Sequence, residues 1–251
     1  RSAVLTNTMA ERLPDFLVLG TQKGGTTTLQ QLLIQHPGVY LAPGKEVHYF
    51  SKHWEQPTAW YASHYAGAAP QQRCGDITPF YLFHPQAPQR IHSLLPKAQL
   101  IVLLRDPVER ALSQYFHSVR LGFETLTLED ALAAEQERLN SGERQHLQEH
   151  SYLSRSRYLE QLDRYGALFP DQQLLVLQSE ALFTDPAAKW QQIETFLGLP
   201  QAPCPAATPR ANAGQGESAA VAEAIRTELR QQLRETALGV RQRYGFGWTW
   251  A

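Results

Sequence analysis

Apolar residues follow two different periods along the chain. Short apolar runs predict buried strands at Phe16–Leu19, Gln99–Leu104 and Gln173–Leu177, with shorter strands near Val39–Leu41 and Arg73–Gly75. Helical spacing of apolar residues predicts the helices Thr26–Gln35, Gln86–Leu94, Pro107–Leu121, Thr127–Leu139, Arg155–Leu168, Pro186–Leu197 and Glu217–Arg243. Strands that alternate with helices indicate an α/β fold, in which helices flank a central, mainly parallel sheet.

A glycine-rich turn follows the first predicted strand. Gly20, Gly24 and Gly25 stand between that strand and the helix that begins at Thr26. Such a turn directs backbone N–H groups and the positive end of the helix dipole at an anion. Gly20 and Gly25 fit the outer glycines of a Walker A turn, but Thr26 occupies the lysine position and Lys23 lies inside the loop. This predicts a P-loop-NTPase-like three-layer sandwich whose phosphate site is not built for ATP.

An arginine follows the second long strand. Asp106 is a natural N-cap and Pro107 a natural first residue of the next helix, so Arg105 is expected at the carboxyl end of its strand. Ligands of open parallel sheets bind at such ends. The planar guanidinium suits a phosphate monoester, and Ser113 adds a neutral donor. In the structural alternative, Arg105 pairs with Glu109 and Ser113 is an ordinary helical residue.

Together these segments resemble the sulfotransferases that use 3′-phosphoadenosine 5′-phosphosulfate. Residues 21–28 are similar to the 5′-phosphosulfate loop and residues 100–115 to the 3′-phosphate site, and the pattern matches from about residue 15 to about residue 199. The resemblance implies that Lys23 stabilises the bridging oxygen as the sulfonate leaves. It also implies a set of donor-binding residues: Lys23, Gly24, Gly25, Thr26, Thr27, Thr28, Arg105, Ser113, Tyr158, Asn212 and Gly214.

The acceptor side is predicted from residues 43–50. This segment resembles the Lys-Glu-Pro-His-Phe-Phe pattern of the heparan-sulfate-type branch and of related bacterial enzymes, with Val47 in place of the proline. Glu46 and His48 would lie on one face of an extended stretch. The resemblance implies that Glu46 is the general base, that His48 assists, and that both act with Lys23. In the structural alternative, Glu46 is a surface carboxylate and His48 a packed core residue.

A second acceptor segment covers residues 75–81. It resembles a Gly-Glu-Ala-Thr-Pro-x-Tyr stretch of the bacterial members, although its Thr-Pro is also an ordinary turn. The resemblance implies acceptor contacts from Lys45, Asp76, Thr78 and Tyr81.

One metal motif is present by spacing alone. His146 and His150 match the H-x-x-E-H zinc pattern. The neighbouring residues are strongly polar and no third ligand on a helical scaffold follows, which favours a solvated helix end. We therefore predict no metal site.

Composition fits one domain. With 251 residues, 43% of them hydrophobic, the chain can bury one core. We expect a single domain over residues 1–251, with an N-terminal extension at 1–14, a loop at 200–216 that closes over the nucleotide, and an aromatic tail docked on the core. The net charge of −1 gives no global basic field for nucleic acid, and no apolar run is long enough to span a membrane.

Cysteine content bears on the compartment. Cys74 and Cys204 make no disulfide framework, and we expect two free, buried thiols in a reducing compartment. A bacterial cytoplasmic location is therefore expected, and a domain excised from a larger or Golgi-resident protein also fits.

These patterns predict metal-independent transfer of a sulfonate from 3′-phosphoadenosine 5′-phosphosulfate to an acceptor hydroxyl, with release of 3′,5′-adenosine bisphosphate. The acceptor would be a glycan or a β-hydroxyacyl chain on a carrier protein. Two alternatives stay open. One is a P-loop-type kinase or NTPase with a displaced lysine, which would require magnesium. The other is a nucleotide-binding module without activity.

Overall fold

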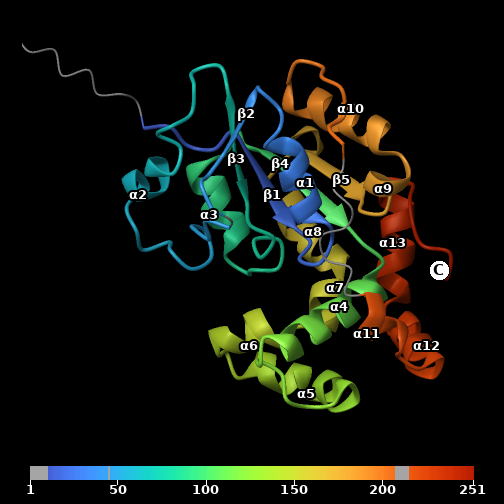
Figure 1. The fold of residues 1–251 in the computed structure, drawn as a ribbon. Helices are drawn as coiled ribbons and strands as arrows, with labels where there is room; N and C mark the ends of the chain where they lie inside the picture. Colours follow the sequence, from blue (N-terminus) through green and yellow to red (C-terminus); the bar gives the residue numbers. More distant parts are fainter. Residues whose placement is uncertain (1–10, 45, 207–214) are drawn as a thin grey trace, which may run out of the picture.

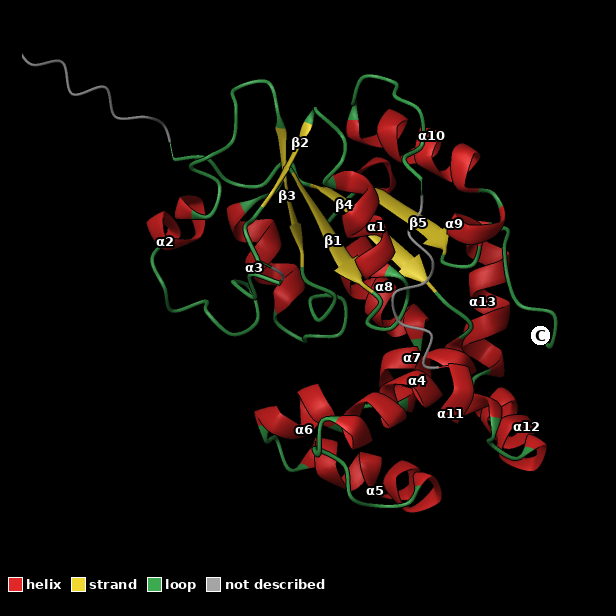
Figure 2. Ribbon diagram, viewed as in Figure 1, coloured by secondary structure: helices red, strands yellow, loops and turns green. Residues whose placement is uncertain are grey.

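A sheet of five parallel strands forms the centre of the computed structural model, which describes residues 11–44, 46–206 and 215–251 (Figure 1, Figure 2). The strands are β1 (Phe16–Gly20), β2 (Val39–Leu41), β3 (Arg73–Ile77), β4 (Gln99–Leu104) and β5 (Leu174–Gln178), in the order β2-β3-β1-β4-β5. All the pairs are parallel. Strands β2 and β3 lie on one side of β1 and the later strands β4 and β5 on the other, so the strand order reverses beside β1. Ligands of such sheets bind at the carboxyl ends of the strands near this point.

Helices cover the sheet and extend beyond it. They are α1 (Thr26–Leu33), α2 (Thr58–Ser63), α3 (Ala87–Leu94), α4 (Pro107–Arg120), α5 (Leu128–Asn140), α6 (Arg144–Glu149), α7 (Leu153–Ser156), α8 (Tyr158–Gly166), α9 (Ala181–Thr184), α10 (Pro186–Leu197), α11 (Gln215–Ala219), α12 (Glu223–Gln232) and α13 (Arg234–Tyr244), with the 3-10 helix η1 at Asp171–Gln173. Helices α5 and α6 lie away from the sheet, beyond α4 (Figure 1).

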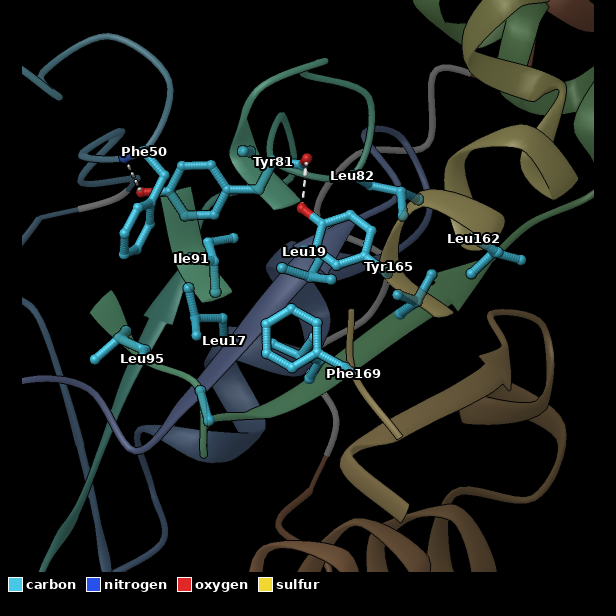
Figure 3. Packing of buried hydrophobic residues seen from close by; sticks show 14 of the residues in the cluster. Leu17, Leu19, Phe50, Tyr81, Leu82, Ile91, Leu95, Leu162, Tyr165 and Phe169 are labelled. Atoms are coloured by element: carbon cyan, nitrogen blue, oxygen red, sulfur yellow. Dashed lines mark hydrogen bonds between the residues drawn. The ribbon is translucent and has the colours of Figure 1, made fainter. Parts of the chain in front are cut away.

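The central strands bury both of their faces. Leu17 and Leu19 of β1 join a core cluster with residues of α3, α8 and α13, and Figure 3 shows part of this packing. Phe16 and Val18 point the other way, into a cluster with α1 and α10. Alternate side chains of one strand therefore reach two helical layers. The predicted three-layer α/β sandwich is confirmed.

Several helix boundaries differ from the prediction. The helix expected at 155–168 is two helices, because Arg157 leaves the helical region with ψ 77°. The helix expected at 217–243 is three, interrupted at Ala222 and Leu233. Helices α2, α6 and α9 were not predicted. Apolar periodicity continues across a single non-helical residue, so the pattern does not register such breaks.

The aromatic tail packs on the core, as predicted. Trp248 is 6% exposed, and Trp250 Nε1 donates to Asp106 Oδ2 at 2.7 Å. Gln178 Nε2 donates to the carbonyl of Gly247 at 3.1 Å, which ties the tail to β5. The end of the chain is thereby fixed beside the carboxyl ends of β4 and β5.

The remaining expectations about the chain have mixed outcomes. Both cysteines are free, but only Cys74 is buried and Cys204 is partly exposed. Residues 1–10 of the predicted extension and 207–214 of the predicted closing loop lie outside the described residues, and Gln215–Ala219 is helical rather than loop. Across the described part of the chain, no helix has both the length and the apolar character needed to cross a bilayer.

Candidate active site

The predicted donor loop lies between the end of β1 and the start of α1, beside the end of β4. A Cβ atom on Gly24 would come within 2.8 Å of the Thr21 carbonyl and 2.9 Å of the Leu103 carbonyl, so only glycine fits there. Gly25 has a φ of 89°, and a Cβ atom on it would lie 3.0 Å from Ser179 Oγ. Both glycines allow the loop to fold closely over the strand ends.

The loop leads directly into the N-terminus of α1. Gly25 is the N-cap and has no side chain to bond the first N–H groups of the helix. Thr26 and Thr28 are buried, and Thr27 is partly buried. Lys23 has a φ of 67°, which sets it in the left-handed region inside the loop. The start of α1 thus has the form of an anion site built from main-chain donors.

Arg105 joins the two predicted donor segments. Its Nη1 donates to the carbonyl of Lys23 at 3.1 Å. Its own carbonyl accepts from the hydroxyl of Tyr158 at 2.7 Å, and Tyr158 is fully buried. The alternative pairing with Glu109 is wrong, because Glu109 forms its ion pair with Arg226. Arg105 is therefore held at the carboxyl end of β4 by contacts with the loop and with α8.

The residues around Arg105 border a cavity of about 530 Å³. Asp106 lines it and caps α4 as predicted, accepting from the N–H groups of Val108 at 2.9 Å and Glu109 at 3.2 Å. Glu180 Oε1 accepts from the Asp106 N–H at 2.8 Å. Ser113 lies further along α4 and is partly buried. Of the predicted donor residues, Arg105 lines this cavity, whereas residues 21–28 do not.

The predicted catalytic pair on the acceptor side is in contact. Glu46 Oε2 lies 3.1 Å from His48 Nε2, and the side chains are 30% and 14% exposed. His48 Nδ1 lies 3.0 Å from Ser51 Oγ. The stretch is not extended, which corrects the prediction: Glu46 and His48 have φ values of 61° and 56°. The two side chains meet because both residues turn through the left-handed region.

The residues predicted to bind the acceptor form an internal network instead. Asp76 accepts hydrogen bonds from Thr78 Oγ1 at 2.7 Å and from the hydroxyls of Tyr61 at 2.7 Å and Tyr81 at 2.9 Å. All four side chains are fully buried. Burial raises the pKa of Asp76, and the three hydrogen bonds act against that rise. These side chains offer no surface to a ligand in this structure.

A buried arginine connects the donor and acceptor sides. Arg155, which is 2% exposed, donates to Gln22 Oε1 in the donor loop. Its guanidinium lies 4.9 Å from the ring centre of Phe80, whose ring is 6.3 Å from that of His48. Burial lowers the pKa of Arg155 to about 9, while the charge of Glu46 is among those that oppose the shift. The lysine loop and the Glu46–His48 pair therefore belong to one site.

Sequence reasoning missed part of this arrangement. It expected Tyr158, near Arg155, to contact the donor, but it did not identify Gln22, Tyr61 or Ser51. A charged residue at a helix start carries no signal that it will be buried against aromatic rings. Tyr61 lies in α2, which was itself not predicted.

Positive charge gathers near the acceptor side. Burial lowers the pKa of His84 to about 4, and the charges of Arg90, Arg144 and Arg164 add to that shift. These arginines come from α3, α6 and α8, and none of them forms an ion pair with a described carboxylate. The three helices thus bring a local basic region to a chain of near-zero net charge.

Some predicted residues stay outside this description. Lys45, Asn212 and Gly214 lie outside the described residues. His146 and His150 face each other with their Nδ1 atoms 2.9 Å apart, and the described residues hold no group of three metal-type ligands. The expectation of a solvated helix end is wrong for His150, which is 5% exposed and lies 2.9 Å from the Phe123 carbonyl.

Comparisons with known proteins agree with this geometry. The sulfotransferase domain family matches residues 13–207. The human heparan sulfate glucosamine 3-O-sulfotransferase 6 is 32% identical over 193 residues, which cover 75% of this chain and 53% of that protein. The membrane-associated sulfotransferase kil1 of Dictyostelium discoideum is 43% identical over 111 residues, which cover 43% of this chain and 24% of that protein. The chain thus spans about half or less of the length of these relatives.

A solved structure extends the match to nearly the whole fold. The sulfotransferase from Alicyclobacillus acidocaldarius superimposes with a TM-score of 0.80 and 26% identity, covering 95% of this chain and 99% of that one. The sequence family, the curated relatives and the fold agree, and the chain belongs to the sulfotransferase family.

Proposed function

We propose that this protein transfers a sulfonate group from 3′-phosphoadenosine 5′-phosphosulfate to a hydroxyl of an acceptor and releases 3′,5′-adenosine bisphosphate. The main support is the 3.1 Å hydrogen bond from Arg105 to the carbonyl of Lys23. It joins two segments that are 82 residues apart and that the donor would bridge. Membership of the sulfotransferase family supports the same reaction.

The donor would be held at both of its phosphate ends. The N–H groups of residues 25–28 suit the 5′-phosphate, while the N–H of Gly24 already donates to the Thr21 carbonyl at 2.8 Å. The missing Cβ of Gly25 keeps the loop open beside Ser179. Arg105 and Ser113 suit the 3′-phosphate. Because the Tyr158 hydroxyl bonds the carbonyl of Arg105, we assign Tyr158 to positioning Arg105. Asn212 and Gly214 remain predicted donor contacts.

The reaction step needs one base and one cation. Glu46 takes the proton from the acceptor hydroxyl as its oxygen forms a bond to sulfur. The bond between sulfur and the bridging oxygen breaks, and its electron pair stays on the phosphate, where Lys23 stabilises the charge. His48, 3.1 Å from Glu46, orients the carboxylate and shares the proton. Sulfur passes from one oxygen to another with no change of oxidation state.

An anionic glycan is the acceptor that the site supports best. Arg90, Arg144 and Arg164 gather around His84, and the human relative is named for action on heparan sulfate. A glycan with carboxylate or sulfate groups would pair with these guanidinium groups. An acyl chain on a carrier protein is the alternative. The free thiols of Cys74 and Cys204 fit a reducing compartment, and a cytoplasmic location stays a proposal.

The kinase alternative is not favoured. It requires a carboxylate after β4 that is free to hold magnesium. Arg105 takes that position, and the Asp106 carboxylate already bonds two N–H groups of α4 and the indole of Trp250.

Nucleotide binding tests the donor assignment. 3′,5′-Adenosine bisphosphate should raise the melting temperature far more than 5′-AMP or magnesium ATP, because only it offers the 3′-phosphate. Arg105→Ala should weaken bisphosphate binding by about 1.5–3 kcal/mol, roughly ten- to 150-fold. Arg243→Ala is the control, since Arg243 forms a surface pair with Asp163. Equal stabilisation by bisphosphate and AMP would contradict the 3′-phosphate site.

Turnover tests the reaction and its acceptor. The protein would be incubated with sulfur-labelled donor and three acceptors: a heparan-type oligosaccharide, a neutral oligosaccharide and a β-hydroxyacyl carrier protein. We expect label in the anionic oligosaccharide. Label in the carrier-bound chain alone would reject the glycan, and label in none would leave a nucleotide-binding module.

A further inference from the structure

Asp76 is a buried carboxylate without a cationic partner in its immediate hydrogen-bond set. It is fully buried in β3 and accepts from three hydroxyl groups, those of Tyr61, Thr78 and Tyr81, at 2.7–2.9 Å. A carboxylate in such surroundings is costly unless its hydrogen bonds are satisfied. The three hydroxyls satisfy the carboxylate, and their hydrogen bonds to it hold the hydroxyls in place. Asp76 therefore sets the direction of three side chains.

Two of these hydroxyls continue to the segment that carries the catalytic pair. Thr78 Oγ1 accepts from the backbone N–H of His48 at 3.4 Å. The Tyr81 hydroxyl accepts from the backbone N–H of Phe50 at 3.4 Å, as Figure 3 shows. Each hydroxyl thus donates to Asp76 and accepts from the loop. The carboxylate is linked to two alternate N–H groups on either side of Tyr49.

The third hydroxyl has no such continuation. The ring of Tyr61 stacks on that of Tyr49, with centroids 4.3 Å apart and an interplanar angle of 5°. It also meets the ring of Phe50 edge-on, with centroids 5.3 Å apart, and the Tyr61 hydroxyl donates to Asp76. Tyr61 therefore donates to the same carboxylate as Thr78 and Tyr81, but its hydroxyl accepts no backbone N–H group of the described loop residues.

The loop needs support of this kind. Glu46 and His48 both have left-handed backbone conformations, which are unfavourable for residues with a Cβ atom. Such conformations persist where the surroundings hold them. Tyr81 is itself held from its other side, because the Tyr165 hydroxyl donates to its carbonyl at 2.8 Å (Figure 3). The Thr78 and Tyr81 hydroxyls thus present fixed acceptors to a segment of unusual geometry.

We infer that Asp76 is a positioning residue for proton transfer, acting through Thr78 and Tyr81 to hold Glu46 and His48 in register. It touches neither donor nor acceptor. This inference rests on the proposed function, since Glu46 is taken as the base. The sequence suggested that Asp76, Thr78 and Tyr81 contact the acceptor directly. In the role inferred here they instead hold the loop that carries Glu46 and His48.

Three conservative variants separate positioning from stability. Thr78→Val and Tyr81→Phe remove the two hydroxyls that reach the loop, and Tyr61→Phe removes the one that does not. Each deletes one hydrogen bond to the same carboxylate, and Thr78→Val and Tyr81→Phe also delete the bond to the loop. Tyr61→Phe therefore measures the loss of stability that comes from the carboxylate bond alone. We expect kcat to fall about ten- to 100-fold in Thr78→Val and Tyr81→Phe, as small misplacements of reacting groups do. Tyr61→Phe should stay within about twofold, and bisphosphate affinity should hardly change in any of them.

A second readout does not depend on turnover. The NMR resonances of the His48 imidazole ring, assigned with His48→Gln, report its contact with Glu46. Their chemical shifts should change in Thr78→Val and Tyr81→Phe and stay unchanged in Tyr61→Phe. Equal kcat values and equal chemical shifts in all three variants would overturn the positioning role. Changed chemical shifts in a protein that never transfers sulfonate would support the positioning role while rejecting the proposed function.

Discussion

Replacing Glu46 by glutamine removes the proposed proton acceptor and keeps the shape of the side chain. The side chain is 30% exposed and its described contact is with His48, so the fold should tolerate the amide. The amide can still hydrogen-bond His48 Nε2, but it has no basicity at neutral pH. Glu46→Gln therefore tests proton transfer with little other disturbance.

The expected loss follows from what remains in the site. Removal of a general base typically costs about 10²–10⁴ in rate. Here His48 Nε2 lies 3.1 Å from the lost carboxylate, so a second base stands within reach. We expect Glu46→Gln to lower kcat by about 10²–10³, which corresponds to roughly 2.7–4 kcal/mol in the barrier. The double variant Glu46→Gln, His48→Gln should lose about 10⁴, because both bases are then absent.

Two measurements are needed together. Single-turnover transfer from labelled donor gives the chemical step, and calorimetric titration with 3′,5′-adenosine bisphosphate gives donor affinity. Affinity should change less than about twofold, because a base that acts on the acceptor contributes little to donor binding. Glu55→Gln is the matched control, since Glu55 is an exposed carboxylate in the same region of the chain.

A variant that turns over within a few-fold of the native protein would refute the assignment. His48 would then be the base, and the likeness to the heparan-sulfate-type branch would no longer describe the mechanism. A large fall in bisphosphate affinity would also count against the reasoning, since Glu46 would then serve the donor.

Three further predictions concern metal, pH and packing. The Asp106 carboxylate already bonds an N–H group of α4 and the indole of Trp250, so it is not available to hold magnesium. EDTA should therefore leave the rate of sulfonate transfer within about twofold. Loss of activity that magnesium restores would favour the kinase alternative. Burial lowers the pKa of His84 to about 4, so below pH 6.5 the unfolded chain binds a proton at His84 that the folded protein does not bind. The free energy of unfolding should therefore fall by about 1–2 kcal/mol from pH 6.5 to pH 4, after allowance for the partial exposure of the side chain. In His84→Gln the melting temperature should depend less on pH over this range, and the same pH dependence in both proteins would contradict the assignment. Gly75→Ala would place a Cβ atom 2.2 Å from Cζ of the fully buried Phe16, so it should destabilise the protein by about 1–3 kcal/mol or more. Gly166→Ala is the control, because a Cβ atom there would meet no atom within 4 Å. Equal denaturant midpoints of unfolding for the two variants would refute the clash.

The parts of the fold that could be predicted are those with a strong local signal. β2 and β4 were placed at their observed bounds, because buried parallel strands are short apolar runs between turn residues. The donor loop was found because Gly24 and Gly25 satisfy a steric need that is visible in the sequence. Asp106 and Pro107 marked the start of α4 by the preferences of helix N-termini.

The rest depended on contacts that only the tertiary structure creates. Glu46 and His48 were expected to meet through an extended backbone, and positive φ at two residues with side chains is too rare to infer from sequence. Asp76 was expected to face the acceptor, because nothing local shows that three hydroxyls from α2 and the turn after β3 would surround it. Arg155 was predicted to begin a helix, while its burial against Phe80 and Phe83 depends on rings from a distant segment.

The hydrogen bond between Trp250 and Asp106 has a consequence for how the protein is made. Arg105 sits beside a residue whose carboxylate also accepts from the indole of Trp250, 144 residues later in the chain. Contacts of such large separation form late, because the intervening chain must first be synthesised and closed into a loop. A ribosome-bound chain that has emerged only as far as β5 would hold the glycine loop and the strand end without this support. We expect the nascent protein to gain affinity for its nucleotide only after residue 250 has left the ribosomal exit tunnel.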